Sequence, residues 1–170
     1  EPLANLDYKL REQLRAELQS IFANDSSIVI YSTAEPSEAL DFATDTFVIN
    51  EGKLIQSGKA LEIYQKPQSI PAAIAMADPP INLLKSTIDG KTANFGPENF
   101  KLSRPEINVS SAQEITLGIQ PGMVSLEPKS SKSVSFQCQV QLSEVTGSST
   151  FIHVKLPSGE QIVIEVEGTN

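Results

Sequence analysis

The sequence is poor in the residue types on which many functions depend. Its 170 residues contain no tryptophan, one cysteine and one histidine, and 13 lysines and arginines stand against 21 acidic residues. A single cysteine, Cys138, cannot form an internal disulfide, which favours a reducing, cytosolic compartment. Without a His/Cys cluster, no metal site is expected. The net charge of −8 argues against nucleic-acid binding, because basic side chains supply most of the affinity for phosphates.

Three further absences limit the possible functions. No apolar run approaches the roughly 18–20 residues that span a bilayer. The phosphate-loop pattern G-x-x-x-x-G-K-[ST] does not occur, so no loop of this kind is predicted to hold nucleotide phosphates. The lone His153 falls in a strand-like alternation and has no nucleophile-elbow sequence to accompany it, so a solvent-facing strand position is favoured over a catalytic role.

The chain changes character near Asp78-Pro79-Pro80. Before that point, apolar residues at spacings of three and four predict an amphipathic helix over residues 7–22, with Asp7 as its N-cap. The continuous β-branched run at residues 28–31 predicts a buried strand of a parallel sheet. Pro36 opens a second helix, and Gly52 marks a hairpin between residues 47–49 and 53–56. Two shorter helical pieces are predicted over residues 59–64 and 70–76.

After the prolines, short strands alternate with turn signals such as Asp89-Gly90, Pro121-Gly122 and Ser158-Gly159. This spacing is typical of a small β-barrel or sandwich. The predicted strands cover residues 81–88, 91–95, 100–102, 114–120, 124–127, 133–144, 150–156 and 161–166.

The first seven residues, E-P-L-A-N-L-D, resemble the end of the Walker B strand and the D-loop of ABC-transporter ATPases. Further stretches are similar to motifs of the same family in the same order, among them a T-A-E-P-S-E-A-L stretch where the family carries its switch loop. The chain therefore resembles the C-terminal part of the ATP-binding subunit of a carbohydrate or polyol ABC importer of the maltose type, with an accessory TOBE/OB-like β domain. The matching stretches are residues 1–7, 32–40, 45–58, 61–67, 78–84 and 117–124.

The resemblance implies an α/β part followed by an all-β part. Residues 1–66 would be the C-terminal remnant of the ABC ATPase core, residues 67–80 a helical, proline-rich linker, and residues 81–170 a regulatory TOBE barrel with an OB-like fold.

The same resemblance implies the site residues. Glu1 would be the catalytic Walker B carboxylate that polarises the hydrolytic water, and Asn5 and Asp7 would contact a partner ATPase subunit through the D-loop. Ala34 stands at the position of the switch histidine, where a methyl group cannot bind the γ-phosphate. Either the parent is degenerate here, or Thr33 or Glu35 partly substitutes, or the site was altered.

The implied function is ATP hydrolysis that powers sugar or polyol import. The parent would use ATP and Mg, pair with a second, identical or paralogous ATPase subunit, and bind a transmembrane permease at the inner face of the cell membrane. The present chain, without the phosphate loop, is expected to need no cofactor and to hydrolyse no ATP alone. The alternative is a regulatory or dimerisation β module that binds solute or a regulatory protein. A third class, oligonucleotide binding by an OB-type barrel, is opposed by the charge.

Overall fold

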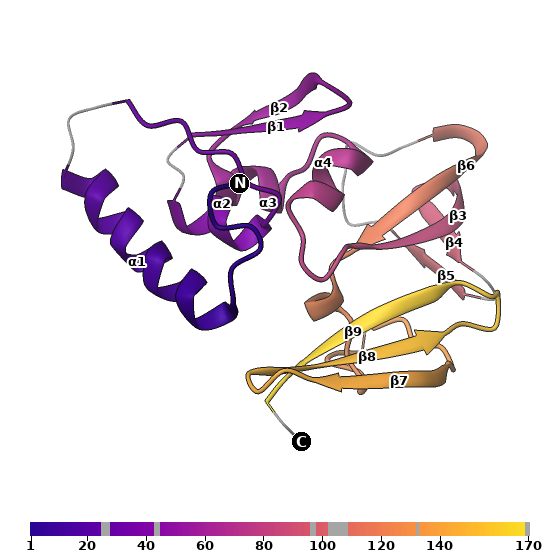
Figure 1. The fold of residues 1–170 in the computed structure, drawn as a ribbon. Coiled ribbons are helices and arrows are strands. Elements are labelled where there is room, and N and C mark those ends of the chain that lie inside the picture. The colour runs from indigo at the N-terminus through magenta and orange to yellow at the C-terminus, as the bar shows by residue number, and fades with distance from the viewer. Residues whose placement is uncertain (25–27, 43–44, 96–97, 102–108, 132, 169–170) are drawn as a thin grey trace. The chain divides into compact units, whose positions relative to one another are not determined.

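The computed structural model describes residues 1–24, 28–42, 45–95, 98–101, 109–131 and 133–168 (Figure 1). They divide into two compact units, Glu1–Asp78 and Pro79–Asn170. The first unit holds all the α-helices of the described residues, and the second consists mainly of strands. Across these residues, no helix is both long enough and apolar enough to cross a membrane.

Helix α1 spans Tyr8–Asn24, so the predicted amphipathic helix is confirmed. Its start is fixed by Asp7, whose Oδ1 accepts the Leu10 N–H at 3.0 Å and so satisfies a free donor of the first turn. At its other end Phe22 packs edge-to-face against Tyr31 and Phe42, with ring centroids 6.2 and 5.9 Å away. This aromatic cluster joins α1 to the segment that follows it in the chain.

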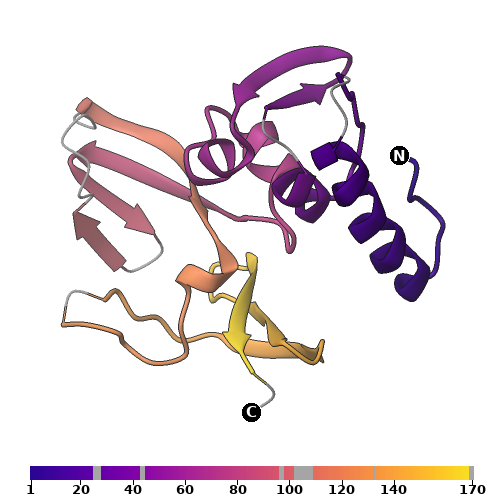
Figure 2. The ribbon, with the colours of Figure 1, turned by 90° about the vertical axis from the view of Figure 1, so that its left-hand side faces the viewer.

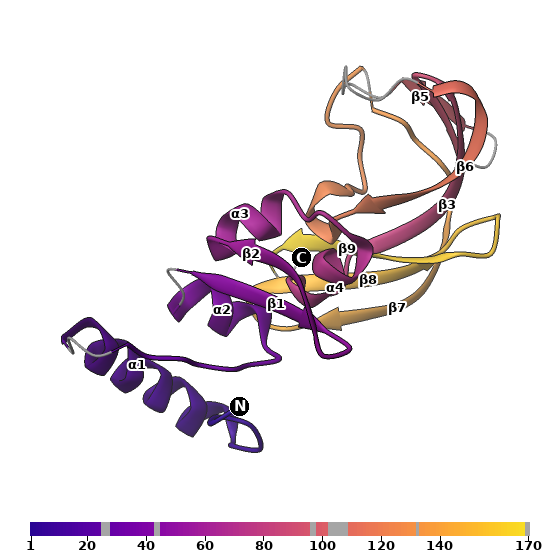
Figure 3. The same ribbon diagram turned by 90° about the horizontal axis from the view of Figure 1, so that it is seen from above.

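The rest of the first unit is built around a β-hairpin. The turn has positive φ at Glu51 (48°) and Gly52 (73°), which matches the right-handed twist of the two strands and confirms the predicted hairpin. Val48, Ala60, Ile63 and Met76 form the buried core beneath it. Figure 3 shows the hairpin together with the helices that contact it. The element bounds are α2 Pro36–Phe42, β1 Thr46–Asn50, β2 Lys53–Gly58, α3 Ala60–Gln65 and α4 Ile70–Ala75.

The strand predicted at residues 28–31 is not formed. The segment pairs with no other strand among the described residues, and Ile28 and Ile30 are 95% and 93% exposed. A strand buried in a parallel sheet needs neighbours on both sides to satisfy its N–H and C=O groups and to cover its side chains. The hairpin supplies neither, so an apolar run that predicts a strand lies here as an uncovered extended segment.

The second unit contains two antiparallel sheets, one with the strand order β5-β4-β3-β6 and one with the order β7-β8-β9. A short 3₁₀ helix, η1 (Pro121–Met123), follows the first sheet, and in Figure 2 the orange chain beyond it runs on as a loop before β7. This β-rich architecture is consistent with the predicted TOBE/OB-like domain. The strand bounds are β3 Asn82–Gly90, β4 Thr92–Phe95, β5 Glu98–Lys101, β6 Val109–Ile119, β7 Gln139–Val145, β8 Ser149–Lys155 and β9 Gln161–Glu167.

The core of the second unit draws on both sheets. In β3 the buried residues alternate with exposed ones, as expected for a strand with one face toward a core. Leu84 and Phe95 of the first sheet pack in one cluster with four residues from β8, β9 and the turn between them. Those four are Val154, Leu156, Ile162 and Ile164.

One predicted strand of the second unit is wrong, and another is wrong in part. Residues 124–127 form no strand, because the Ser125 hydroxyl donates to the Glu127 carbonyl at 2.7 Å and holds a local bend instead. The strand predicted over residues 133–144 begins only at Gln139, after a turn in which the Ser133 N–H donates to the Ser130 carbonyl. Strand β6 begins earlier than predicted, and Leu102, the predicted end of another strand, lies outside the described residues.

Candidate functional site

A small hollow in the first unit brings together the two positions that the family resemblance places in the catalytic site, Glu1 and the degenerate switch-histidine position Ala34. Its volume is about 50 Å³. Glu1 and Ala34 both line it, although they are far apart in the sequence, whereas Asn5 and Asp7 do not. The full lining is Glu1, Leu3, Ala4, Arg11, Thr33, Ala34, Glu35 and Glu38.

The N-terminal side of the hollow is a tight turn anchored by one apolar side chain. Leu3 is only 4% exposed, and the Ala4 N–H donates to the Glu1 carbonyl at 3.3 Å. Asn5 takes a left-handed conformation with φ of 64°, which asparagine tolerates better than most residues. Asp7 then starts α1, so its carboxylate is engaged as a helix cap in this structure.

The other side of the hollow is a turn held by a single hydroxyl. Thr33 Oγ1 accepts the Glu35 N–H at 2.9 Å and donates its own proton to Glu38 Oε2 at 2.5 Å. Ala34 lies between Thr33 and Glu35, and it is exposed. The turn therefore presents the methyl group of Ala34 to solvent.

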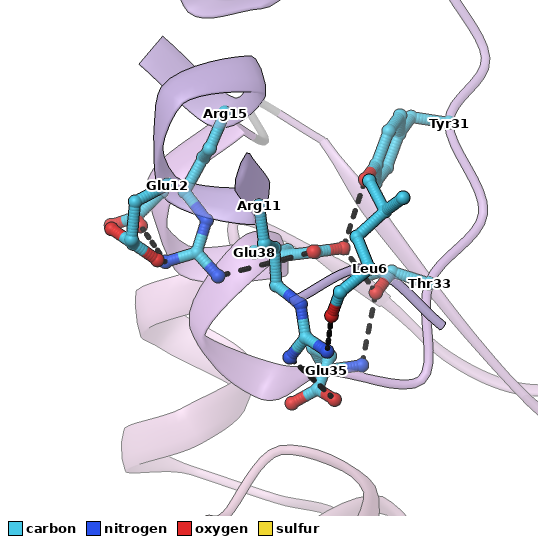
Figure 4. Close-up of polar contacts among 9 residues, drawn as sticks. Leu6, Arg11, Glu12, Arg15, Tyr31, Thr33, Glu35 and Glu38 are labelled. Atoms are coloured by element: carbon cyan, nitrogen blue, oxygen red, sulfur yellow. Dashed lines mark hydrogen bonds and ion pairs between the residues drawn. The ribbon is translucent and has the colours of Figure 1, made fainter. Parts of the chain in front are cut away.

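Glu38 is a buried carboxylate on α2, with 2% of the residue exposed. Besides Thr33, it accepts the Tyr31 hydroxyl proton at 2.9 Å, and its second oxygen lies 3.9 Å from Arg15 Nη2 (Figure 4). Burial, together with the hydrogen bond to Glu38 and the charge of that carboxylate, raises the pKa of Tyr31 to about 12. Tyr31 therefore acts here as a neutral hydrogen-bond donor.

Two arginines of α1 reach this cluster from the helix. Arg11 donates to the Leu6 carbonyl at 3.2 Å, and its Nη1 lies 3.8 Å from Glu35 Oε1 (Figure 4). Arg15 lies 3.1 Å from Glu12 and 3.6 Å from Asp41, in addition to its contact with Glu38. The arginines thus connect the helix that follows the N-terminal turn to the turn that carries Ala34.

Sequence reasoning missed Glu38, Arg11 and Arg15. A signal was available, because Glu38 and Phe42 are four residues apart and therefore share one face of α2. An acidic residue on the apolar face of a short helix indicates a buried, partnered carboxylate. The identity of its partners could not be read in the same way, since they come from α1 and from the segment before α2.

The hollow alone does not fit a nucleotide. Its volume of about 50 Å³ is close to that of one or two water molecules, whereas small-molecule sites usually enclose some 300–1,000 Å³. Among the residues that the structure describes, no group of three or more His, Cys, Asp or Glu side chains is arranged to hold a metal ion. A nucleotide site that included this hollow would need further groups from outside it.

Comparison with known proteins gives a family for the end of the chain. Residues 117–170 match the TOBE domain. This span begins within β6 and includes all of the sheet β7-β8-β9. The β part of the predicted fold is thereby supported by a family as well as by the strands.

Similarity to individual proteins extends over nearly the whole chain. The sn-glycerol-3-phosphate import ATP-binding protein UgpC 3 of Rhizobium etli is 32% identical over 99% of the chain. The xylose/arabinose import ATP-binding protein XacK of Haloferax volcanii is 29% identical over 95%. The putative uncharacterized ABC transporter ATP-binding protein YcjV of Escherichia coli K12 is 29% identical over 100%.

The chain spans a little under half the length of these relatives: 46% of UgpC 3, 42% of XacK and 48% of YcjV. Their names and the TOBE match confirm the predicted resemblance to ATP-binding subunits of carbohydrate and polyol ABC importers.

Proposed function

We propose that this chain, which resembles importer ATP-binding subunits along its whole length, is the C-terminal part of such a subunit. The subunit hydrolyses ATP to power the import of a sugar or polyol through a membrane permease. The names of the relatives support ATP binding and sugar or glycerol-phosphate import as the general role. The TOBE match over residues 117–170 supports the later part of the regulatory β domain that we propose over residues 81–170.

One observation carries the catalytic part of the proposal: Glu1 and Ala34 line the same hollow. In the parent, Glu1 is the carboxylate that polarises the attacking water, and Ala34 occupies the position of the switch histidine. Asn5 and Asp7 face the second ATPase subunit. Residues 1–66 are then the end of the ATPase core, and the rest of the parent supplies the phosphate loop and most of the ATP and Mg site.

The uncovered segment at residues 28–31 supports this assignment. Its Ile28 and Ile30 side chains are almost fully exposed, and exposed apolar residues within an unpaired extended segment indicate a missing neighbour. In the parent, strands from the remainder of the ATPase core pair with this segment and cover it. The parent lies on the cytoplasmic face of the membrane, bound to the permease and to the second ATPase subunit.

The proposal is tested with the full-length subunit carrying Glu1→Gln. Replacing the carboxylate with an amide keeps its size and removes the charge that polarises water, so turnover should fall by at least about a hundredfold while ATP binding persists. Glu17→Gln, an exposed position on α1 outside the hollow, is the matched control and should retain turnover. Equal turnover in Glu1→Gln and Glu17→Gln would contradict the assignment of Glu1.

The isolated chain provides a second, independent test. Residues 1–170 should neither bind nor hydrolyse ATP, since the hollow has about the volume of one or two waters. Measurable turnover in a preparation free of other ATPases would overturn this expectation.

A second candidate function is solute binding by the β unit. The observation that favours it is a depression of about 700 Å³, within the usual range for ligand sites. Lys85, Thr87, Asn94, Glu114 and Thr116 line it with both donors and acceptors, and Ser86 and Ile115 complete the lining. Sugars and polyols should raise the unfolding temperature of the chain if they bind here, and Thr87→Val should abolish that rise. If none of these sugars and polyols raises the unfolding temperature, this candidate function is excluded.

A further inference from the structure

We propose that Glu38 is a positioning residue that holds the turn at residues 33–35 beside Glu1 and ties that turn to helix α1. This inference rests on the proposed function, because it assigns the turn a part in ATP hydrolysis.

The first step of the argument is the chain of contacts that defines the turn. A threonine hydroxyl can donate one proton and accept others. Thr33 donates its proton to the buried carboxylate of Glu38, which orients the oxygen so that it accepts the Glu35 N–H at 2.9 Å. Glu38 therefore determines, through Thr33, the backbone conformation on both sides of Ala34.

The second step concerns which neighbouring residue, Thr33 or Glu35, could take over the role of the histidine whose position Ala34 occupies. Thr33 is not free to replace the missing histidine, since its hydroxyl is already engaged as both donor and acceptor. Glu35 is about half exposed, with 49% of its side chain accessible, and it lies 3.8 Å from Arg11. The contribution of the turn to ATP hydrolysis then depends on the positions of its backbone and of Glu35. Glu38 controls both positions through Thr33.

The third step links the turn to the N-terminal segment. Glu38 lies 3.9 Å from Arg15, and Arg11 bridges Glu35 and the Leu6 carbonyl, so both arginines of α1 contact the cluster (Figure 4). A buried carboxylate that loses a partner leaves an uncompensated charge. A displacement of α1 would therefore be transmitted to the turn, and the two sides of the hollow would move together.

The experiment on the isolated chain compares Thr33→Val with Thr33→Ser by backbone ¹⁵N relaxation. Valine has nearly the shape of threonine but no hydroxyl, whereas serine keeps it. In Thr33→Val the order parameter of the Ala34 amide should fall from about 0.85 to below about 0.6, and in Thr33→Ser it should not. Glu38→Ala should resemble Thr33→Val, and if it fails to fold, the threonine pair still decides. An order parameter unchanged in Thr33→Val overturns the positioning role.

The companion experiment uses the full-length subunit. Thr33→Val should lower kcat by about tenfold to a hundredfold with KM for ATP unchanged, because misplacing a catalytic segment slows the chemical step. Thr33→Ser should stay within about twofold of the unsubstituted subunit. Equal kcat in the two variants overturns the proposal. A wild-type subunit that hydrolyses no ATP contradicts the proposed function instead, and the relaxation data still decide whether Glu38 fixes the turn.

Discussion

Asn82 and Val163 exchange two hydrogen bonds although 81 residues separate them in the sequence. Asn82 Nδ2–H donates to the Val163 carbonyl at 2.8 Å, and the Val163 N–H donates to Asn82 Oδ1 at 2.7 Å. The carboxamide of Asn82 thus takes the place of a neighbouring peptide group. Because Asn82 is on β3 and Val163 is on β9, this one side chain ties the two sheets of the second unit together.

Asn82→Leu should lower the free energy of unfolding by about 2–4 kcal/mol. The change leaves the partly buried Val163 N–H and C=O without their partners, and an unsatisfied group away from water costs about 1–3 kcal/mol. Urea unfolding followed by circular dichroism measures the effect. Asn94→Leu is the matched control: its amide lies 3.4 Å from the Thr87 hydroxyl at an exposed contact, so a change of about 0.5 kcal/mol is expected. Equal urea midpoints for Asn82→Leu and Asn94→Leu would contradict the role of Asn82 in joining the two sheets.

The stability of the first unit should fall as the pH rises from 10 toward 12. The folded-state pKa of Tyr31 is raised from 10.0 to about 12, so its contribution is complete below pH 10 and is lost as the pH passes through the folded value. Phenolate absorbance should show a late titration that Tyr31→Phe removes. In Glu38→Gln that tyrosine should titrate earlier, but not at its ordinary pKa, because burial is the largest cause of the shift. A titration unaffected by Glu38→Gln would show that the two side chains are not in contact.

In the full-length subunit, Ala34→His should raise the turnover of ATP and leave ATP affinity nearly unchanged. A histidine supplies the donor that a methyl group lacks, and the exposed position of Ala34 leaves space for the ring. Ser37→His, at an exposed position on α2 outside the hollow, controls for the presence of a new imidazole. Turnover that does not rise in Ala34→His would mean that another group already fills the role.

Gly52→Ala should destabilise the first unit by about 1–2 kcal/mol, because its φ of 73° is unfavourable for a residue with a Cβ. A Cβ at this position would meet no neighbouring atom within 4 Å, so any loss reflects backbone strain and not a clash. Gly52→Asn is the conservative comparison, since asparagine tolerates this region better. Thermal unfolding of both variants checks that Gly52→Ala is less stable than Gly52→Asn. A Gly52→Ala variant as stable as the unsubstituted chain would refute the prediction.

The elements that could be predicted from the sequence are those specified by local chemistry. Helix α1 follows from the spacing of its leucines and from the Asp7 cap, and the hairpin follows from Gly52. The segment at residues 28–31 was mispredicted because strand formation depends on neighbours that local sequence does not reveal. The segment at residues 124–127 was mispredicted because one serine side chain competes with strand pairing.

The site shows the same division between local and long-range information. Glu1 and Ala34 are predicted as site positions from family motifs, and both line one hollow. Glu38 was missed because a carboxylate is normally expected at the surface. Its burial is energetically tolerated because Tyr31 and Thr33 donate hydrogen bonds to it and Arg15, from a different helix, lies beside it. The roles of Asn5 and Asp7 toward a second subunit stay predictions.

The aromatic cluster of Phe22, Tyr31 and Phe42 belongs to a wider asymmetry in the chain. All three tyrosines (Tyr8, Tyr31 and Tyr64) lie within Glu1–Asp78, and tryptophan is absent. Near-ultraviolet absorbance and intrinsic emission therefore originate from the first unit, and the β-rich unit is almost invisible to them. The protein carries its own optical label on one of its two halves, so the first unit can be followed by itself without a dye or an added chromophore.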